Sequence, residues 1–183
     1  MLNWLKERHD RGRTARELYG SIVTQARLAP FYALLGVPDT PRGRFELIVL
    51  HTALVMQRLQ QEGPEGIALA RTLGETFVTD MDDNMRELSF SDLAVPREVK
   101  KIAAALYDRH KSIAAALDAV PADSDPLAEA LARQLAYLQP EGASGIDTKR
   151  LARYTRDAAA GLSRQDAALL ASSGPAWPMT IEK

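Results

Sequence analysis

The residues best suited to chemistry in this chain form an acidic group at positions 80–87. Its four carboxylates and one cation are Asp80, Asp82, Asp83, Glu87 and Arg86. At helical spacing Asp80, Asp83 and Glu87 share one flank. Asp82 and Arg86, four residues apart, lie on the other flank and can form a weak ion pair. Such rows of charge fit three roles: a solvated helix face, a metal site, or a surface that binds a partner.

The start of this group resembles the calcium-binding loop of an EF-hand, because Asp80, Asp82 and Asn84 alternate with other residues. That loop requires glycine at its sixth position and a bidentate glutamate at its twelfth. This chain has Met85 and Ser91 there, so we reject an EF-hand. Our main hypothesis is that the acidic group pairs with arginines or backbone amides of a partner, with a solvated face as the alternative.

Candidates for catalysis are few. The three histidines are His9, His51 and His110, and the last two lie at apolar helical positions where a hydrogen-bonded core histidine is expected. The chain has no Glu-x-x-His pair and no HExxH, GxSxG, Walker or GxGxxG motif. We therefore predict no enzyme activity, no bound metal and no cofactor. The alternative is a metal-dependent enzyme in which the carboxylates at 80–87 converge with His51.

The acidic group lies on a predicted amphipathic helix. Phe77, Met81, Met85 and Leu88 fall on one helical stripe, which is typical of a helix that buries one face against its neighbours. The turn closes at Ser91 or Asp92, and Pro96 suits the first turn of the following helix because it lacks the amide that would be unpaired there. We expect a pair of helices that carries the charges on its outer side.

Helical signals cover nearly the whole chain, and no segment alternates as a strand would. The predicted helices span 13–28, 41–61, 63–88, 96–119, 126–138, 147–160 and a last segment that begins with a capping box of Ser163 and Asp166. The helix at 41–61 is apolar on more than one face, which predicts a central position. The sequence therefore indicates an all-α, single-domain bundle of about seven helices, with a core from residues 18–117 and an appended C-terminal helical pair.

The expected organisation has three parts: a basic N-terminal segment at 1–15, a helical core at 16–120, and C-terminal helices with a Pro/Trp tail at 121–183 packed on the same domain. In the tail, Trp177 lies between prolines and cannot be helical. We expect Trp177 to dock on the body, because a tryptophan left in water gives up a large burial gain.

Composition excludes several classes of protein. With 183 residues, 23 basic and 24 acidic, the chain is long enough for one domain, and its formal charge of −1 gives no general case for nucleic-acid binding. The absence of cysteine excludes disulfides, thiol catalysis and cysteine-ligated metals. The longest apolar stretch, 48–56, is far shorter than the ~20 residues that cross a bilayer.

The N-terminus carries no apolar signal region, and we expect a cytoplasmic location. Its Leu2, Trp4 and Leu5 stand among basic residues. One interpretation is a short helix that rests on the inner face of an anionic membrane. The interpretation that we prefer is an N-terminal helix packed on the body through Trp4 and Leu5.

Several separate motifs resemble the ubiquinol-cytochrome c chaperone family. The run DMDDNMRELSFSDLAVPREVKKIAAALYDR at 80–109 is similar to the central region of that family. Upstream, the FY pair before the GVPDT turn and the RFELIVLH helix at 44–51 are similar to its opening. The resemblance covers roughly residues 16–118. It departs at Leu106–Asp108, where the family pattern has an aromatic residue, tyrosine and glycine before the arginine.

The resemblance implies an assembly chaperone of respiratory complex III. Such a protein binds newly made cytochrome b, or another subunit of the complex, until cofactors and partner subunits join it. A small helper protein and the membrane surface are the other partners that the resemblance implies. The acidic group at 80–87 is our candidate surface for such a contact.

Overall fold

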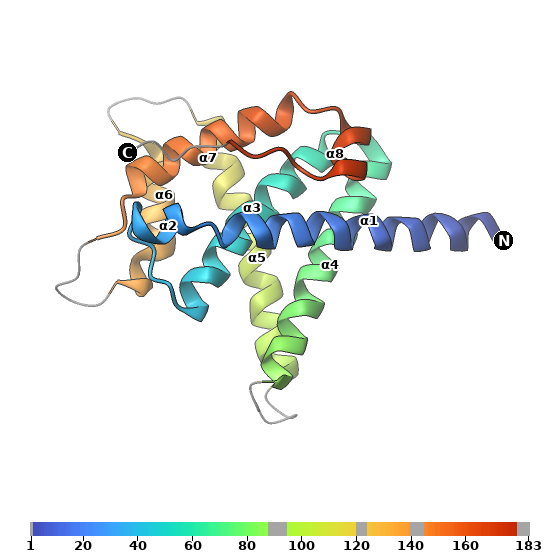
Figure 1. Cartoon of the computed structure of the whole chain (residues 1–183), viewed down its shortest axis with the longest axis horizontal. Helices are drawn as coiled ribbons and strands as arrows, with labels where there is room; N and C mark the ends of the chain where they lie inside the picture. The colour runs from blue at the N-terminus through green and yellow to red at the C-terminus, as the bar shows by residue number, and fades with distance from the viewer. Residues whose placement is uncertain (1, 88–94, 120–123, 140–144, 179–183) are drawn as a thin grey trace.

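The fold of this chain is entirely helical (Figure 1). The computed structural model describes residues 2–87, 95–119, 124–139 and 145–178, and of residues 2–8, 85–87 and 95–96 it describes the backbone alone. In chain order the elements are α1 (Leu2–Ala26), α2 (Ala29–Ala33), α3 (Pro41–Gln60), α4 (Gly63–Glu87), α5 (Val95–Asp118), α6 (Pro126–Leu135), the 3₁₀ turn η1 (Ala136–Leu138), α7 (Thr148–Ser163) and α8 (Ala167–Ser173). The predicted all-α bundle is confirmed.

Helix α3 is the central element, as its apolar composition predicts. It contacts α1, α4, α5 and α7, and it is buried on all sides over most of its length. Its start follows from local chemistry: the Thr40 side chain accepts a hydrogen bond from the Gly43 amide, and Pro41 opens the helix. The helices that contact α3 are therefore arranged around one buried central helix (Figure 1).

The hydrophobic core extends well beyond the predicted residues 18–117. Leu127 and Leu131 of α6 and Leu151 and Leu162 of α7 belong to the same buried cluster as Leu18 of α1. The prediction of a smaller core was wrong because each C-terminal helix has an apolar stripe that must be covered. Helix α7 lies against α3, and α6 contacts both α5 and α7, so these stripes close over the core.

Helix α1 joins two predicted segments. It is one continuous helix of 25 residues from Leu2, whereas the sequence interpretation treated an N-terminal helix around Trp4 and Leu5 separately from the helix that begins at Arg13. No proline interrupts residues 2–26, so nothing in the backbone ends the helix earlier. Its first turns extend past α4 and α8 (Figure 1). The side chains of Trp4 and Leu5 lie outside the described ones.

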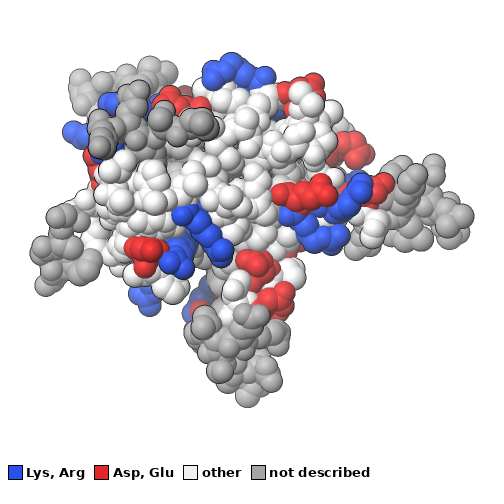
Figure 2. All heavy atoms as spheres, viewed as in Figure 1, with Lys and Arg blue, Asp and Glu red and all other residues white. Residues whose placement is uncertain are grey.

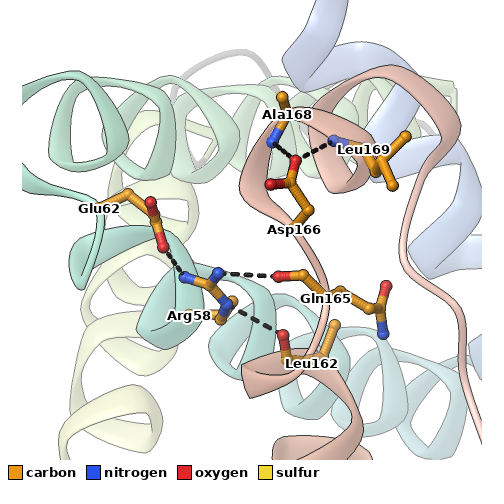
Figure 3. A network of polar contacts seen from close by, with 7 residues as sticks. All are labelled: Arg58, Glu62, Leu162, Gln165, Asp166, Ala168 and Leu169. Carbon is orange, nitrogen blue, oxygen red and sulfur yellow. Dashed lines mark hydrogen bonds and ion pairs between the residues drawn. The ribbon is translucent and has the colours of Figure 1, made fainter.

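Helix caps confirm one local prediction and correct another. Asp125 accepts hydrogen bonds from the Leu127 and Ala128 amides and so starts α6, as expected. The predicted capping box at the last helix was wrong. Ser163 ends α7 and donates to the Ala160 carbonyl oxygen, whereas the Asp166 carboxylate accepts from the first amides of α8 (Figure 3). The turn between the two helices separates Ser163 from the amides that it would have to cap.

Candidate partner-binding surface

Helices α4 and α5 pack along each other, and their adjoining ends extend away from the rest of the molecule (Figure 1). The predicted turn at Ser91 or Asp92 lies outside the described residues. On α4 the predicted apolar stripe is confirmed where it is described: Phe77 is fully buried, and Met81 packs against the core. The side of α4 away from this stripe carries charged residues, and acidic atoms lie on the molecular surface over α4 (Figure 2).

Asp80 has a structural role within the molecule. The hydroxyl of Tyr19 on α1 donates a hydrogen bond of 2.8 Å to the Asp80 carboxylate, which is partly buried. Burial, and then this hydrogen bond, raise the pKa of Tyr19 far above its ordinary value, so the tyrosine remains a donor. Asp80 therefore joins α1 to α4 and is not simply an exposed charge.

The other members of the acidic group differ in their surroundings. Asp83 is exposed, whereas Asp82 is partly buried and already has an interaction of its own. Arg86 and Glu87 lie in the last turn of α4, and their side chains fall outside the described ones. The predicted ion pair between Asp82 and Arg86 therefore remains a prediction. Among the described side chains, Asp83 is the carboxylate of this group that is most accessible to a partner.

His51 is a hydrogen-bonded core histidine, as predicted. Its Nδ1 lies 2.7 Å from the Leu47 carbonyl oxygen, and its Nε2 lies 2.7 Å from the hydroxyl of Tyr154. Because a carbonyl only accepts, Nδ1 carries the hydrogen and Nε2 accepts from Tyr154. The Tyr154 oxygen in turn accepts from the Gln25 amide at 3.0 Å. Burial lowers the pKa of His51 to about 4, so the ring is neutral near pH 7.

This geometry does not support the metal-enzyme alternative. Both nitrogens of His51 are occupied inside the core, so the ring cannot meet the carboxylates of α4. In the part of the chain that the structure describes, no group of three or more histidine, aspartate and glutamate side chains is arranged to hold a metal ion. His110 differs from the prediction, because its buried Nε2 has no hydrogen-bond partner among the described residues.

Sequence reasoning missed a buried ion pair that positions α5. Arg109 donates two hydrogen bonds, of 2.8 and 2.7 Å, to the two carboxylate oxygens of Glu46 on α3. Tyr137 of η1 donates a third, of 2.7 Å, to the same carboxylate, which is only 2 % exposed. The ion pair raises the pKa of Arg109. A glutamate inside the apolar helix 41–61 was the one signal in the sequence, since a buried charge requires a partner.

Comparison with known proteins identifies the family. The family profile described as ubiquinol-cytochrome C chaperone matches residues 33–177. The chain belongs to this family. A crystal structure of the Cbp3 homolog from Brucella abortus is also similar to this chaperone, with 33% sequence identity over 99% of this chain and 98% of that chain and a TM-score of 0.79. A search of curated proteins finds no match.

The family match confirms the predicted resemblance from residue 33 onward and extends it toward the C-terminus. It includes α6, α7, α8 and the start of the tail up to Trp177, where sequence reasoning recognised only turns and helices. Together with the helical architecture, the match supports a role for the chaperone in the assembly of complex III and indicates a non-enzymatic factor. None of the described helices combines the length and the apolar character that a bilayer-spanning segment requires.

Proposed function

We propose that this chaperone binds newly made cytochrome b during the assembly of complex III, and that the exposed acidic part of α4 contributes to the contact. The observation that carries the proposal is the family match over residues 33–177. Asp83 supports it, because its side chain is exposed and α4 carries it toward the end of the α4–α5 pair that extends away from the body (Figure 1).

Carboxylates suit this role because they accept charge-assisted hydrogen bonds from arginine side chains and from backbone amides of a partner. Holding a client requires no nucleophile and no acid–base pair, only a surface whose charges guide association and fix its orientation. Glu87, Asp82 and Arg86 complete the proposed surface around Asp83. A small helper protein is the other candidate partner for this surface.

The variants that test the proposal must leave Asp80 in place, because its loss would leave the hydroxyl of Tyr19 without an acceptor. We therefore choose Asp83→Lys combined with Glu87→Lys. The matched control is Glu17→Lys with Asp118→Lys, which makes the same change of charge at exposed positions on α1 and α5. Both proteins are expected to keep the melting temperature of the wild type to within a few degrees.

The measurement is co-purification of cytochrome b with the tagged chaperone from native membranes, quantified by mass spectrometry. The Asp83→Lys, Glu87→Lys protein should recover several-fold less cytochrome b, because each new lysine repels a cation that the carboxylate had attracted. The control protein should recover the wild-type amount. Equal recovery by both variants would show that this surface does not hold the client.

A further inference from the structure

A second surface of interest is a groove of about 700 Å³ between α7 and the tail residues 176–178. One wall is a single face of α7 and its C-cap, with Arg150, Arg153, Asp157, Gly161 and Arg164 at intervals of three and four residues. The opposite face of α7 is buried in the core. The groove therefore runs along the outer face of a helix whose position is set by packing.

The other wall is held in place by specific hydrogen bonds. The Gln165 side chain accepts from the Ala176 amide and donates to the Ala176 carbonyl oxygen, both at 2.8 Å. The ring of the next residue, Trp177, packs against the ring of His51 in a T-shaped arrangement, with 4.9 Å between the ring centroids. The predicted docking of Trp177 is thus confirmed, and the tail forms a fixed rim.

The end of α7 is also anchored to the centre of the molecule. Arg58 of α3 donates to the carbonyl oxygens of Leu162 and Gln165, each at 2.9 Å (Figure 3). A guanidinium at this position satisfies carbonyls that the end of a helix leaves unpaired. Because both walls are anchored, a ligand would bind the groove without first ordering it.

The lining of the groove carries more arginine than acidic side chains, and the arginines differ in whether they already bind other groups of the chain. Arg150 already contacts the Leu34 carbonyl oxygen. The guanidinium groups of Arg153 and Arg164, both exposed residues, make no ion pair or hydrogen bond within the described part of the chain. Arg164 directly follows the last residue of α7 and lies eleven residues after Arg153, so at the helical rise their Cα atoms are about 16 Å apart along the axis. Asp157 stands between them and is the carboxylate among the described lining residues.

This spacing favours one kind of occupant. Two arginines whose Cα atoms are about 16 Å apart suit a ligand with two separate carboxylates, one for each guanidinium, better than a single phosphate group. A flat layer of lipid headgroups would meet the rim of a concave site rather than its floor. An extended polypeptide rises about 3.3 Å per residue, so carboxylates about four to six residues apart match the two arginines.

We propose that the groove between α7 and the tail binds an acidic, extended segment of a partner polypeptide. Its two carboxylates pair with Arg153 and Arg164, and a neutral or basic residue faces Asp157. The groove lies on α7, whereas the proposed cytochrome b contact lies on α4 and is tested by co-purification. Either proposal can therefore fail without the other.

Gly161 offers a way to block the groove without disturbing the fold. A Cβ atom at this position would meet no heavy atom within 4 Å. Gly161→Leu should therefore fill the groove while α7, which gains a better helix former, remains intact. Gly20→Leu is the matched control, because Gly20 is exposed on α1 and its Cβ would also meet no heavy atom within 4 Å.

A second pair of variants tests the charges. Arg153→Gln with Arg164→Gln removes the two unpaired cations, and Arg97→Gln with Lys100→Gln removes two exposed cations of α5 as the control. The probe is a fluorescein-labelled peptide of twelve residues, with glutamate at positions 4 and 8 among alanine, serine and glutamine. A peptide with lysine at both positions is its counterpart. Binding to the full chain is measured by fluorescence anisotropy at low ionic strength, where charge pairing is least screened.

We expect the wild type and both control proteins to bind the glutamate peptide and not the lysine peptide. Gly161→Leu and the Arg153→Gln, Arg164→Gln protein should bind it about tenfold more weakly. Absence of wild-type binding, or equal binding by the groove variants, would overturn the proposal. So would an unchanged peptide affinity together with lost sedimentation on phosphatidylglycerol vesicles, because that result would assign the arginines to a membrane.

Discussion

The hydrogen bonds from Gln25 through Tyr154 to His51 join α1, α7 and α3 at the centre of the molecule. Tyr154→Phe would remove the shared hydroxyl and leave two buried polar groups unpaired. We expect the free energy of unfolding to fall by about 1–3 kcal/mol in urea denaturation. Tyr107→Phe, at a half-exposed residue of α5, should change it by less than about 0.5 kcal/mol. Equal effects of the two substitutions would contradict this role of Tyr154.

The same histidine makes stability depend on pH. Burial lowers the pKa of His51 from 6.5 to about 4, so above pH 6.5 the ring is neutral in both the folded and the unfolded chain. Between pH 6.5 and 4 only the unfolded chain takes up the proton, and the free energy of unfolding should fall by up to about 3 kcal/mol. Urea denaturation between pH 7.5 and 4.5 measures this slope.

The control for the pH dependence is His51→Gln, which removes the titrating ring. This variant should be less stable at pH 7.5 but should lose less stability on acidification than the wild type. His110, whose pKa burial also lowers, remains in both proteins and contributes with the same sign. Parallel curves for the two proteins would assign the pH dependence to other groups.

At the scale of elements, the ion pair of Arg109 with Glu46 holds α5 on α3. Arg109→Met would leave a buried carboxylate with Tyr137 as its remaining partner, and should lower the free energy of unfolding by about 3–5 kcal/mol. Adding Glu46→Gln removes the buried charge and should restore part of that loss. A double variant that is no more stable than Arg109→Met would contradict the argument. Arg97→Met, at an exposed residue of α5, is the control.

At the scale of the whole molecule, the shared core predicts one cooperative unit. A chain that ends at residue 120 would lose Leu151, Tyr154 and Leu162, which cover α3 and the ring of Phe31. Such a chain should lack a cooperative unfolding transition, whereas the full chain should show coincident transitions by circular dichroism and tryptophan fluorescence. A sharp transition in the short chain would instead support an independent unit at 16–120.

Several local features of the fold were predicted correctly from the sequence, whereas contacts between distant residues were not. Thr40, Pro41 and Asp125 act through their immediate neighbours, so their roles as helix starts were readable from the sequence. The partner of Glu46 could not be predicted from the sequence. Arg109 lies 63 residues away, and local sequence patterns do not indicate which distant residues come into contact. The structural role of Asp80 was missed for the same reason, since Tyr19 contacts it from another helix.

The sequence by itself determined the helical class, the central position of α3, the absence of cysteine chemistry and the resemblance to a chaperone family. The first three features depend on composition and on the 3.6-residue period, and the resemblance depends on short motifs, all of which are local properties of the chain. Only the tertiary structure decided which charges are available. Asp80 is engaged and Asp83 is exposed, although their residue type is the same, because packing of α1 covers one and not the other. The groove at α7 arises in the same way, since its second wall comes from a tail that folds back through Gln165 and Trp177.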